Sequence, residues 1–346
     1  MRNTNAILRK SESFDLENNK QIMINMCLFQ NNNKILMTNS SPFTPQRLAS
    51  INKVNFEYLV LLKDISLYCY PLKPIRAIRM FLRCFYFSRL TIAWFKYIAN
   101  SPLLSKIIEF DSSLAEKLYR HNLRVDYPIH QRLKILTEHY THIDKVLAPI
   151  FLEQAVLQGG MQLALVSAQS ESIYHLTLCY GINGSKEGEL SIVMRGVDNR
   201  QLCRLSFSVR PTLQGHAFYI GGLQGANRES AKQRVNAVCR DCYDLTPRRI
   251  TMEVLWALAK HTKCNKILGV PNKQHISSRR PNKYFNYDEH WLALNATMNN
   301  EGDFVLPLEY AHKELADVKR KRRAKYRKQR ELLEIISADV LNALKD

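Results

Sequence analysis

A histidine and an aspartate stand at a spacing that permits acid–base chemistry in His139-Tyr-Thr-His-Ile-Asp144. A histidine can act as a general base in acyl transfer while a carboxylate orients its ring. The same spacing also arises readily by chance in a chain with ten histidines. We therefore favour the interpretation that His139 belongs to a helix surface or to the core.

Two cysteines, a histidine and a third cysteine follow one another in an order that uses zinc-ligand types. Two residues separate Cys239 from Cys242, and His261 and Cys264 come later. One Cys-x2-Cys pair alone is weak evidence for zinc. Thiols also serve as small buried residues in cores. We expect no metal site here.

Positive charge is concentrated in two stretches of the chain. The 50 Lys and Arg residues exceed the 31 Asp and Glu residues by 19, and the two stretches together hold 16 basic residues and no acidic one. Clustered charge creates a local potential that attracts anionic polymers. The predicted polyanion-binding residues are Arg76, Arg79, Arg83, Lys319, Arg320, Lys321, Arg322, Arg323, Lys325, Arg327, Lys328 and Arg330.

The first stretch, residues 65–108, combines arginines at helical spacing with many aromatic residues. One interpretation is a helix on an anionic membrane surface, with basic residues at the head groups and aromatic residues in the interface. The other, which we favour, is a core helix whose apolar side, with Ile78, Leu82 and Phe85, packs inward while its arginines face solvent. A break in the helix is expected near Ser88, because Arg89 and Lys96 would fall on the apolar side of a longer helix.

The compartment follows from the cysteines and from hydropathy. Eight cysteines are scattered through a 346-residue chain that is large enough to need no disulfide staples. Asn, Gln and charged residues interrupt the first 25 residues, so no signal peptide is expected. No apolar run reaches the roughly 18 residues of a membrane span. These features predict reduced thiols and a cytoplasmic protein, with peripheral contact at the inner membrane left open.

The elements that must position these residues change character along the chain. Residues 1–45 are polar and predicted to be flexible, and residues 46–150 are predicted to be helical. Five β-rich runs between 161 and 223, joined by short turns, predict an antiparallel meander. A helix at 228–243, a second at 248–261 with Thr246 as N-cap, and a strand at 266–270 complete an α/β core over 151–310.

Residues 311–346 are predicted to be a basic C-terminal helix, beginning as early as residue 308. The fold class is thus α+β. It has a helical N-terminal part, a mainly antiparallel sheet with a crossover helix, and this helix at the end.

Several motifs of the last two-thirds of the chain occur in a specific order. They are Tyr219-Ile-Gly-Gly-Leu-Gln-Gly225, Asp244-Leu-Thr-Pro-Arg-Arg249, Ile267-Leu-Gly-Val270, His275, Tyr287-Asp-Glu-His-Trp291, Gly302-Asp-Phe-Val-Leu-Pro307 and Lys321-Arg-Arg-Ala-Lys-Tyr-Arg327. This set resembles the bacterial VirK/YbjX family over roughly residues 120–335. The resemblance implies a virulence-associated or envelope-stress factor linked to surface display of virulence proteins, and it implies no catalytic residue.

The order of elements also resembles the acyl-CoA-dependent N-acetyltransferase fold, in which backbone at a helix N-terminus cradles a pyrophosphate. The predicted helix at 228–243 departs from that pattern, because it stands where the phosphate loop would be. The glycines at the end of the fifth run have a second reading, in which they allow close approach of backbones. If a ligand cleft exists, its expected residues are Tyr219, Gly222, Gln224, Gly225, Arg248, His275 and Trp291.

Three functions are therefore compatible with the sequence. The favoured one is a virulence-associated accessory factor that acts through basic surfaces on an anionic partner, which is an acidic protein client, RNA or inner-leaflet lipid. It needs no cofactor. The second is an acyltransferase with acyl-CoA as donor, so the sequence does not decide whether the protein is an enzyme. The third is an RNA-binding post-transcriptional regulator, although no RNA-binding motif is present.

Overall fold

Helices make up the first part of the described chain. The computed structural model describes residues 42–49, 55–147, 153–156, 158–181, 186–226, 231–278 and 285–345. The chain divides into residues 1–42 and one compact unit that spans residues 43–346. The prediction of a flexible segment over 1–45 lies almost entirely outside the described residues. The helices before the sheet are α2 (Pro45–Ala49), α3 (Phe56–Cys69), α4 (Pro74–Tyr86), α5 (Ser88–Asn100), α6 (Pro102–Phe110), the 3-10 helix η1 (Ser112–Tyr119) and α7 (Ile129–Val146).

Local chemistry sets the ends of these helices. α4 stops at Tyr86 and α5 starts at Ser88, which confirms the expected break. The Ser101 hydroxyl accepts a hydrogen bond from the Leu104 amide at 3.2 Å and caps α6, which has proline at its first position. The Asp111 carboxylate accepts from the Ser113 amide at 3.0 Å and starts η1.

Eight strands form one mixed sheet in the order β1-β2-β3-β4-β5-β6-β8-β7. The five predicted β-rich runs are confirmed as an antiparallel meander. The pairing of β5 with β6 is parallel, which demands a crossover connection. The strands are β1 (Met161–Ser167), β2 (Ile173–Tyr180), β3 (Leu190–Arg195), β4 (Gln201–Thr212), β5 (Gly215–Gly225), β6 (Lys266–Gly269), β7 (Thr297–Met298) and β8 (Phe304–Leu306).

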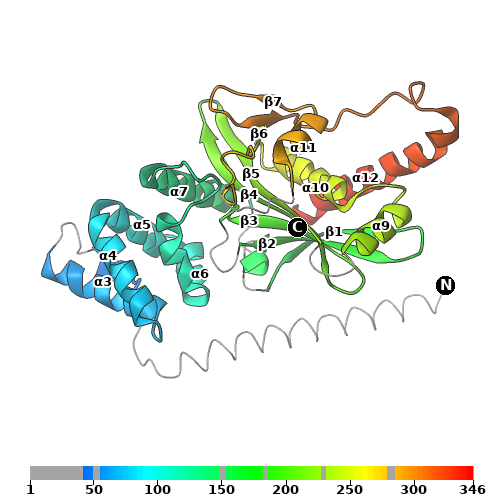
Figure 1. The fold of residues 1–346 in the computed structure, drawn as a ribbon. Helices are drawn as coiled ribbons and strands as arrows, with labels where there is room; N and C mark the ends of the chain where they lie inside the picture. Colours follow the sequence, from blue (N-terminus) through cyan, green and yellow to red (C-terminus); the bar gives the residue numbers. More distant parts are fainter. Residues whose placement is uncertain are drawn as a thin grey trace, which may run out of the picture. The chain divides into compact units, whose positions relative to one another are not determined.

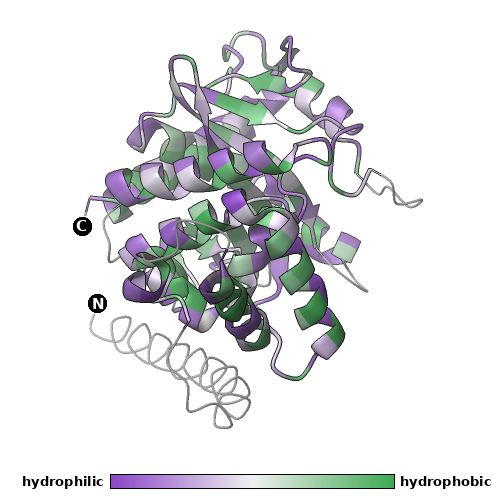
Figure 2. Cartoon of the chain, turned by 90° about the vertical axis from the view of Figure 1, so that its left-hand side faces the viewer, coloured by the Kyte–Doolittle hydropathy of each residue, from purple (hydrophilic) through white to green (hydrophobic). Residues whose placement is uncertain are grey.

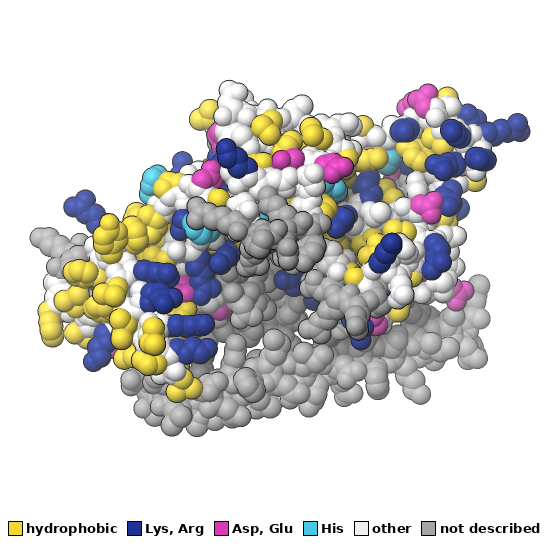
Figure 3. All heavy atoms as spheres, in the orientation of Figure 1, with side chains coloured by type: hydrophobic (Ala, Val, Ile, Leu, Met, Phe, Trp, Pro, Cys, Tyr) yellow, Lys and Arg dark blue, Asp and Glu magenta, His cyan; other side chains and the backbone are white. Residues whose placement is uncertain are grey.

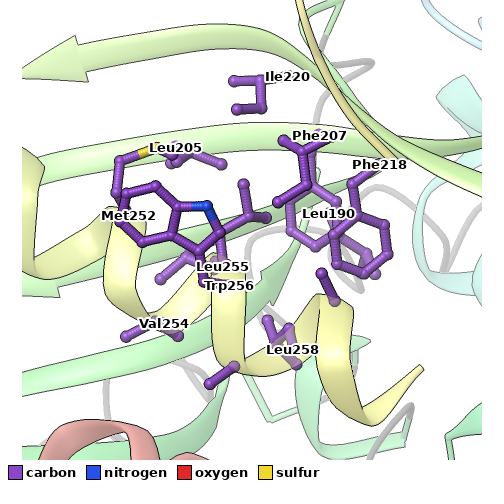
Figure 4. Packing of buried hydrophobic residues seen from close by; sticks show 14 of the residues in the cluster. Leu190, Leu205, Phe207, Phe218, Ile220, Met252, Val254, Leu255, Trp256 and Leu258 are labelled. Carbon is purple, nitrogen blue, oxygen red and sulfur yellow. The ribbon is translucent and has the colours of Figure 1, made fainter. Parts of the chain in front are cut away.

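Helix α10 (Pro247–His261) provides the crossover, after α9 (Ala231–Asp241). The Thr246 hydroxyl accepts from the Arg249 amide at 3.2 Å, which confirms the predicted N-cap. Side chains of α10 pack against those of β3, β4 and β5 (Figure 4). Helix α11 (Tyr287–Ala293) follows β6 and precedes the short strands β7 and β8. The protein is therefore α+β, as predicted, with the crossover helix in place.

Two clusters of buried apolar side chains hold the unit together. One contains residues of α3, α5, α6 and η1, and the other contains residues of the sheet, α10 and the end of the chain. Hydrophobic and hydrophilic residues alternate along most helices, which bury one side (Figure 2), whereas α10 is buried on nearly all sides. No helix among the described residues is long and apolar enough to span a bilayer.

The C-terminal helix is shorter than predicted. Residues 307–319 contain no helix, a 3-10 turn η2 covers Arg320–Arg322, and α12 runs over Arg323–Ala343. The Arg323 guanidinium donates to the carbonyl oxygens of Val318 at 2.9 Å and Ala316 at 3.0 Å. These bonds satisfy carbonyls that a longer helix would have used, and the helix dipole disfavours further cations before its N-terminus. The second half of α12 contacts β1 and α10 (Figure 1).

Candidate functional site

Helix α4 presents three different faces at consecutive positions. Ala77, Met80 and Cys84 are buried, and one residue earlier in each case stand Arg76, Arg79 and Arg83. Successive residues of a helix are about 100° apart, so this shift by one residue places the arginines on their own stripe. Arg76 and Arg79 are exposed and Arg83 is half-buried. Within the described part of the chain, none of the three arginines forms an ion pair.

The third face of α4 is apolar and exposed, which makes the expectation of an inward apolar side wrong. Ile75 is 73% exposed, Ile78 60% and Leu82 57%, each one residue before an arginine. The buried residues of α4 lie on the side that contacts α3, so its exposed aliphatic side chains point away from α3. The Tyr58 hydroxyl of α3 donates to the Cys84 carbonyl at 2.9 Å and fixes this orientation. The aromatic residues of the first basic stretch are not all exposed either, because Trp94 and Phe95 of α5 are buried.

The exposed apolar face continues onto α3. We name the α3–α4 apolar surface after its nine exposed side chains, which are Phe56, Val60, Leu67, Leu72, Ile75, Ile78, Leu82, Phe85 and Tyr86. Figure 3 shows hydrophobic side chains gathered with Lys and Arg over these helices. A shallow hollow of about 300 Å³, lined by Tyr86, Phe87, Ser88, Arg89 and Leu90, lies at the turn between α4 and α5. Apolar contact and positive charge are thus available on one surface.

The second basic stretch, Lys319–Arg330, is partly neutralised by carboxylates of the protein itself. Lys325 pairs with Asp244 at 2.7 Å and Lys328 with Glu331 at 2.8 Å, while Arg330 lies 3.9 Å from Glu334. Exposed pairs of this kind contribute little stability. Arg323 bonds carbonyl oxygens only, and the exposed cations without an ion pair to any described residue are Lys319, Arg320, Lys321, Arg322 and Arg327. A local excess of positive charge therefore remains at the start of α12.

Some of the predicted cleft residues meet around a carboxylate that sequence reasoning missed. Glu187 accepts a hydrogen bond from the Gln224 amide at 2.7 Å, and its other oxygen lies 3.6 Å from His275 Nε2. A Cβ at Gly222 would lie 2.2 Å from the Glu187 carboxylate, so glycine is required for this close approach. The reading of these glycines as sites of close approach is supported by this packing.

His275 lies between a backbone amide and the Glu187 carboxylate. Nδ1 accepts from the Ser277 amide at 3.1 Å while Nε2 faces Glu187. Its ring stacks on Tyr287 at 4.5 Å between centroids, and the Tyr287 hydroxyl accepts from the Leu223 amide at 3.1 Å. The arrangement covers the outer end of β5 with packed side chains. It joins β5 to the segments that carry His275 and Tyr287.

The remaining cleft candidates lie elsewhere. Tyr219 is fully buried and its hydroxyl donates to Asp303 at 2.7 Å, while Trp291 is fully buried and its indole donates to the Val270 carbonyl at 2.9 Å. Arg248 lies over the Phe285 ring at 4.3 Å. A Cβ at Gly225 would lie 3.4 Å from the Arg248 guanidinium, so these two residues are neighbours. Tyr219 and Trp291 are part of the core and do not line the surface around Glu187.

A buried polar cluster joins the helices to the sheet, and its members were not singled out in the sequence. The Glu189 carboxylate pairs with Lys117, accepts from the Tyr140 hydroxyl and lies 3.3 Å from the Asn122 amide nitrogen. Lys117 is 2% exposed and Glu189 0% at the side chain. Burial alone would lower the pKa of Lys117, but the Glu189 carboxylate holds that pKa above its ordinary value.

His139 is a core residue, as we favoured. It is 1% exposed, and its Nδ1 accepts a hydrogen bond from the Val209 amide at 3.0 Å. Burial, with the nearby positive charge of Lys117, lowers the pKa of His139 to about 3. Asp144 is exposed and five residues along the same helix, so it lies on a different face. The two residues do not form an acid–base pair.

The cysteines are spread over several elements. The seven described ones are free thiols, and Cys27 lies outside the described residues. Cys242 is buried and Cys239 half-buried near the end of α9, whereas the Cys264 sulfur lies 4.0 Å from His142 Nε2. Burial raises the pKa of Cys264 to about 11. Among the described residues, no three His, Cys, Asp or Glu side chains form a group that fits a metal ion.

Comparison with known proteins places this fold among bacterial relatives. A family described as "Protein of unknown function (DUF535)" matches residues 73–342. The uncharacterized protein YbjX of Escherichia coli (strain K12) is 27% identical over 264 residues, which cover 75% of this chain and 80% of YbjX. An uncharacterized protein of Haemophilus influenzae is 25% identical over 218 residues, covering 61% of this chain and 70% of that protein. No solved structure matches the chain.

The family match takes in the basic residues of both stretches and the residues around Glu187. It begins at Lys73, one residue before α4, and ends at Asn342 inside α12. Helix α4 and the start of α12 therefore belong to the shared part of the chain, whereas α3 and Leu72 of the α3–α4 apolar surface precede it. The chain belongs to the DUF535 family, the VirK/YbjX family that its motifs resemble.

Proposed function

We propose that this protein is a virulence-associated accessory factor of the bacterial envelope that acts by binding an anionic partner through its basic surfaces. The observation that carries the proposal is the arginine stripe of α4, whose side chains pair with no described carboxylate. Residues 65–108 contain no acidic residue at all. The potential of this stripe is therefore not cancelled by the rest of its stretch, and an anion from outside the molecule lowers the free energy.

The second basic surface, at the start of α12, supports the same proposal. Five exposed cations there form no ion pair with a described residue, so binding a polyanion relieves their mutual repulsion and releases counterions. In Figure 1, α4 and the start of α12 lie at opposite ends of the unit formed by residues 43–346. The two surfaces are therefore separate contact points. We place the protein in the cytoplasm, in contact with the inner face of the membrane.

Heparin retention of the full chain tests the proposal. We expect the α4 variant Arg76→Gln/Arg79→Gln/Arg83→Gln and the α12 variant Lys321→Gln/Arg322→Gln/Arg327→Gln to elute at clearly lower salt than the unmodified protein. The control Lys134→Gln/Lys145→Gln/Lys260→Gln removes three exposed charges elsewhere and is expected to shift elution less. Equal shifts in all three variants would mean that only net charge matters, and the proposed surfaces would be rejected.

RNA is an alternative partner for the same surfaces. It requires exposed aromatic side chains on which bases stack. At the start of α12, the half-buried Tyr326 donates from its hydroxyl to the Lys313 carbonyl at 3.2 Å, and this contact draws it toward the protein. A salt-resistant preference for one RNA sequence over another of equal length would favour the regulator and count against the envelope factor.

Acyl transfer is a second candidate, supported by one feature of the sheet. The parallel pairing of β5 and β6 ends at Ile220 and Gly269, whereas β5 continues to Gly225. An acyl-CoA donor would bind at the edge of β5 beyond this point, beside Gln224 and Arg248, and would displace the Tyr287 side chain, whose hydroxyl accepts from the Leu223 amide. A melting-temperature increase with acetyl-CoA, and none with adenosine 3',5'-bisphosphate at equal concentration, would support this candidate. An equal increase with both would indicate phosphate binding by basic residues.

A further inference from the structure

We infer that the α3–α4 apolar surface docks onto an anionic lipid bilayer, with its aliphatic side chains in the interface and the α4 arginines at the lipid phosphates. This inference rests on the proposed function for the charge of the partner. It adds the chemistry of that partner and a second set of contact residues. The two ideas stand on different observations, because the apolar side chains take no part in electrostatic binding.

Apolar exposure is concentrated on this surface. Of the 18 large hydrophobic side chains that are exposed in the described residues, nine lie between Phe56 and Tyr86. Isolated exposed apolar residues are normal on any protein, whereas a contiguous group marks an interaction site. Water at such a group is released when an apolar phase covers it. The surface therefore has a favourable partner in something apolar.

The order of residues on α4 matches a helix that lies in a membrane surface. The exposed apolar residues Ile75, Ile78 and Leu82 each precede an arginine by one position. The arginine stripe thus runs parallel to the apolar stripe, about 100° around an axis of about 20 Å length. When the apolar stripe enters the boundary of the acyl chains, the long arginine side chains reach up to the head groups.

Charge complementarity selects an anionic bilayer over other apolar partners. A second copy of the chain would bring two arginine stripes close together in a symmetric dimer, and their repulsion opposes that contact. A nucleic acid would satisfy the arginines but offers no apolar phase to Ile75, Ile78 and Leu82. An anionic bilayer satisfies both stripes, since each basic residue near its surface gains about 1 kcal/mol.

The docking surface is already formed before it meets a bilayer. The buried seam of Ala77, Met80 and Cys84 holds α4 against α3, and the Tyr58 hydroxyl bonds the end of α4. A free amphipathic peptide must fold as it binds and loses conformational entropy then. A preformed helix avoids that loss, so a few exposed aliphatic residues suffice for reversible binding.

Vesicle co-sedimentation with the full chain tests the inference. We expect binding to vesicles of equal parts phosphatidylglycerol and phosphatidylcholine, and weak binding to pure phosphatidylcholine. Ile78→Ser/Leu82→Ser is expected to lower binding by about tenfold or more, because two aliphatic side chains that would enter the bilayer are lost. The control Val197→Ser/Leu213→Ser changes two apolar residues outside the surface that are even more exposed, and it is expected to leave binding within about twofold. Circular dichroism and melting temperature report whether each variant is folded.

Insertion itself is measured with a reporter in the surface. Phe85→Trp places an indole on α4, and vesicles containing brominated acyl chains are expected to quench it. The control Met298→Trp, exposed on β7, is expected to show no quenching. Quenching of Phe85→Trp that is absent in the Ile78→Ser/Leu82→Ser background would confirm that the aliphatic residues carry the insertion.

Four outcomes would overturn the inference. Full vesicle binding by Ile78→Ser/Leu82→Ser, with loss only in the arginine variant, would reduce the contact to electrostatics. A dimer in sedimentation velocity that the same serine variant abolishes would assign the surface to self-association. Equal binding to charged and neutral vesicles would remove the role of the arginines. Retention on heparin without any vesicle binding would reject this inference while the proposed function stands, whereas failure of both would reject both.

Discussion

At the scale of single residues, Glu189 connects the two halves of the unit. Its carboxylate is completely buried at the start of β3 and pairs with Lys117 of η1, a residue from the helical part. A buried charge that loses its partner is strongly unfavourable, whereas an exposed pair contributes little. The pair thus fixes how the helical cluster sits on the sheet.

Removing the carboxylate is expected to destabilise the protein severely. Glu189→Gln leaves the Lys117 ammonium buried without a counter-charge, so the free energy of unfolding should fall by about 3–5 kcal/mol. Lys106→Met, which breaks the exposed pair with Glu153, should change it by less than about 1 kcal/mol. Urea denaturation measures both values, and equal losses would contradict a special role for the buried pair.

His139 predicts how stability depends on pH. Its pKa is lowered to about 3 in the folded protein, so the unfolded chain takes up a proton near pH 6.5 that the folded protein refuses. Stability should therefore fall as the pH drops from about 6.5 toward 3, with a limiting slope of about 1.4 kcal/mol per pH unit for this group. His139→Gln keeps an acceptor for the Val209 amide, and its urea midpoints should depend less steeply on pH. An unchanged slope would assign the effect to other groups such as His290, whose pKa burial lowers to about 4.

At the scale of elements, α12 divides into two functional halves. Its first turns carry exposed cations, whereas Leu332, Leu333, Ile336 and Val340 are buried against α10 and β1. One continuous helix thus serves the surface at one end and the core at the other.

Substitutions in the two halves of α12 are therefore expected to change different properties of the protein. Ile336→Ala should lower the free energy of unfolding by about 2–5 kcal/mol, because a fully buried side chain leaves a cavity. Arg327→Gln should change it by less than about 0.5 kcal/mol and lower heparin retention instead. Thermal unfolding and salt elution of the two variants separate these effects, and a stable Ile336→Ala would show that α12 is not part of the core.

The contact of α11 with β6 depends on a glycine. A Cβ at Gly269 would lie 2.7 Å from the Trp291 indole, which is buried and cannot move aside. Gly269→Ala should therefore cost about 1–3 kcal/mol or more by overpacking. Gly225→Ala meets only the end of the flexible Arg248 side chain at 3.4 Å and should be nearly neutral. Melting temperatures of the two alanine variants test this difference in stability.

Much of the element order follows from the sequence, because turn residues and caps are local signals. The Thr246 N-cap, the helix break near Ser88 and the five β-rich runs lie in the structure where the sequence predicts them. The orientation of α4 could not be predicted from the sequence, because Met80 and Cys84 on one side and Ile78 and Leu82 on the other are all apolar enough to be buried. Only the space available beside α3 decides which side is buried, and that is a tertiary property.

The candidate site, like the fold, could be predicted from the sequence only in part. Gln224 and His275 come from distant segments and both contact Glu187, but Glu187 lies in a bend before β3 and carries no spacing that would single it out. Lys117 and Glu189 are 72 positions apart, so no local pattern links them. Long-range pairs of this kind require the pairing of strands to be known.

At the scale of the whole molecule, the net charge of +19 makes stability depend on the anions present. A ligand that binds only the folded protein raises its melting temperature by mass action. We expect polyphosphate to raise the melting temperature at low ionic strength and to have no effect above about 0.5 M salt, where the Debye length is short. An increase that persists at high salt would indicate a specific ligand site rather than the charged surfaces.

The return of α12 to β1 has a consequence for synthesis. Helix α12 (Arg323–Ala343) follows β1 (Met161–Ser167) at a long distance in the chain, yet its apolar side completes the cluster that contains this strand. During synthesis the apolar side of β1 therefore stays uncovered until α12 has left the ribosome. Partly made chains expose surface to chaperones and proteases, so a chain that lacks α12 offers them the apolar side of β1.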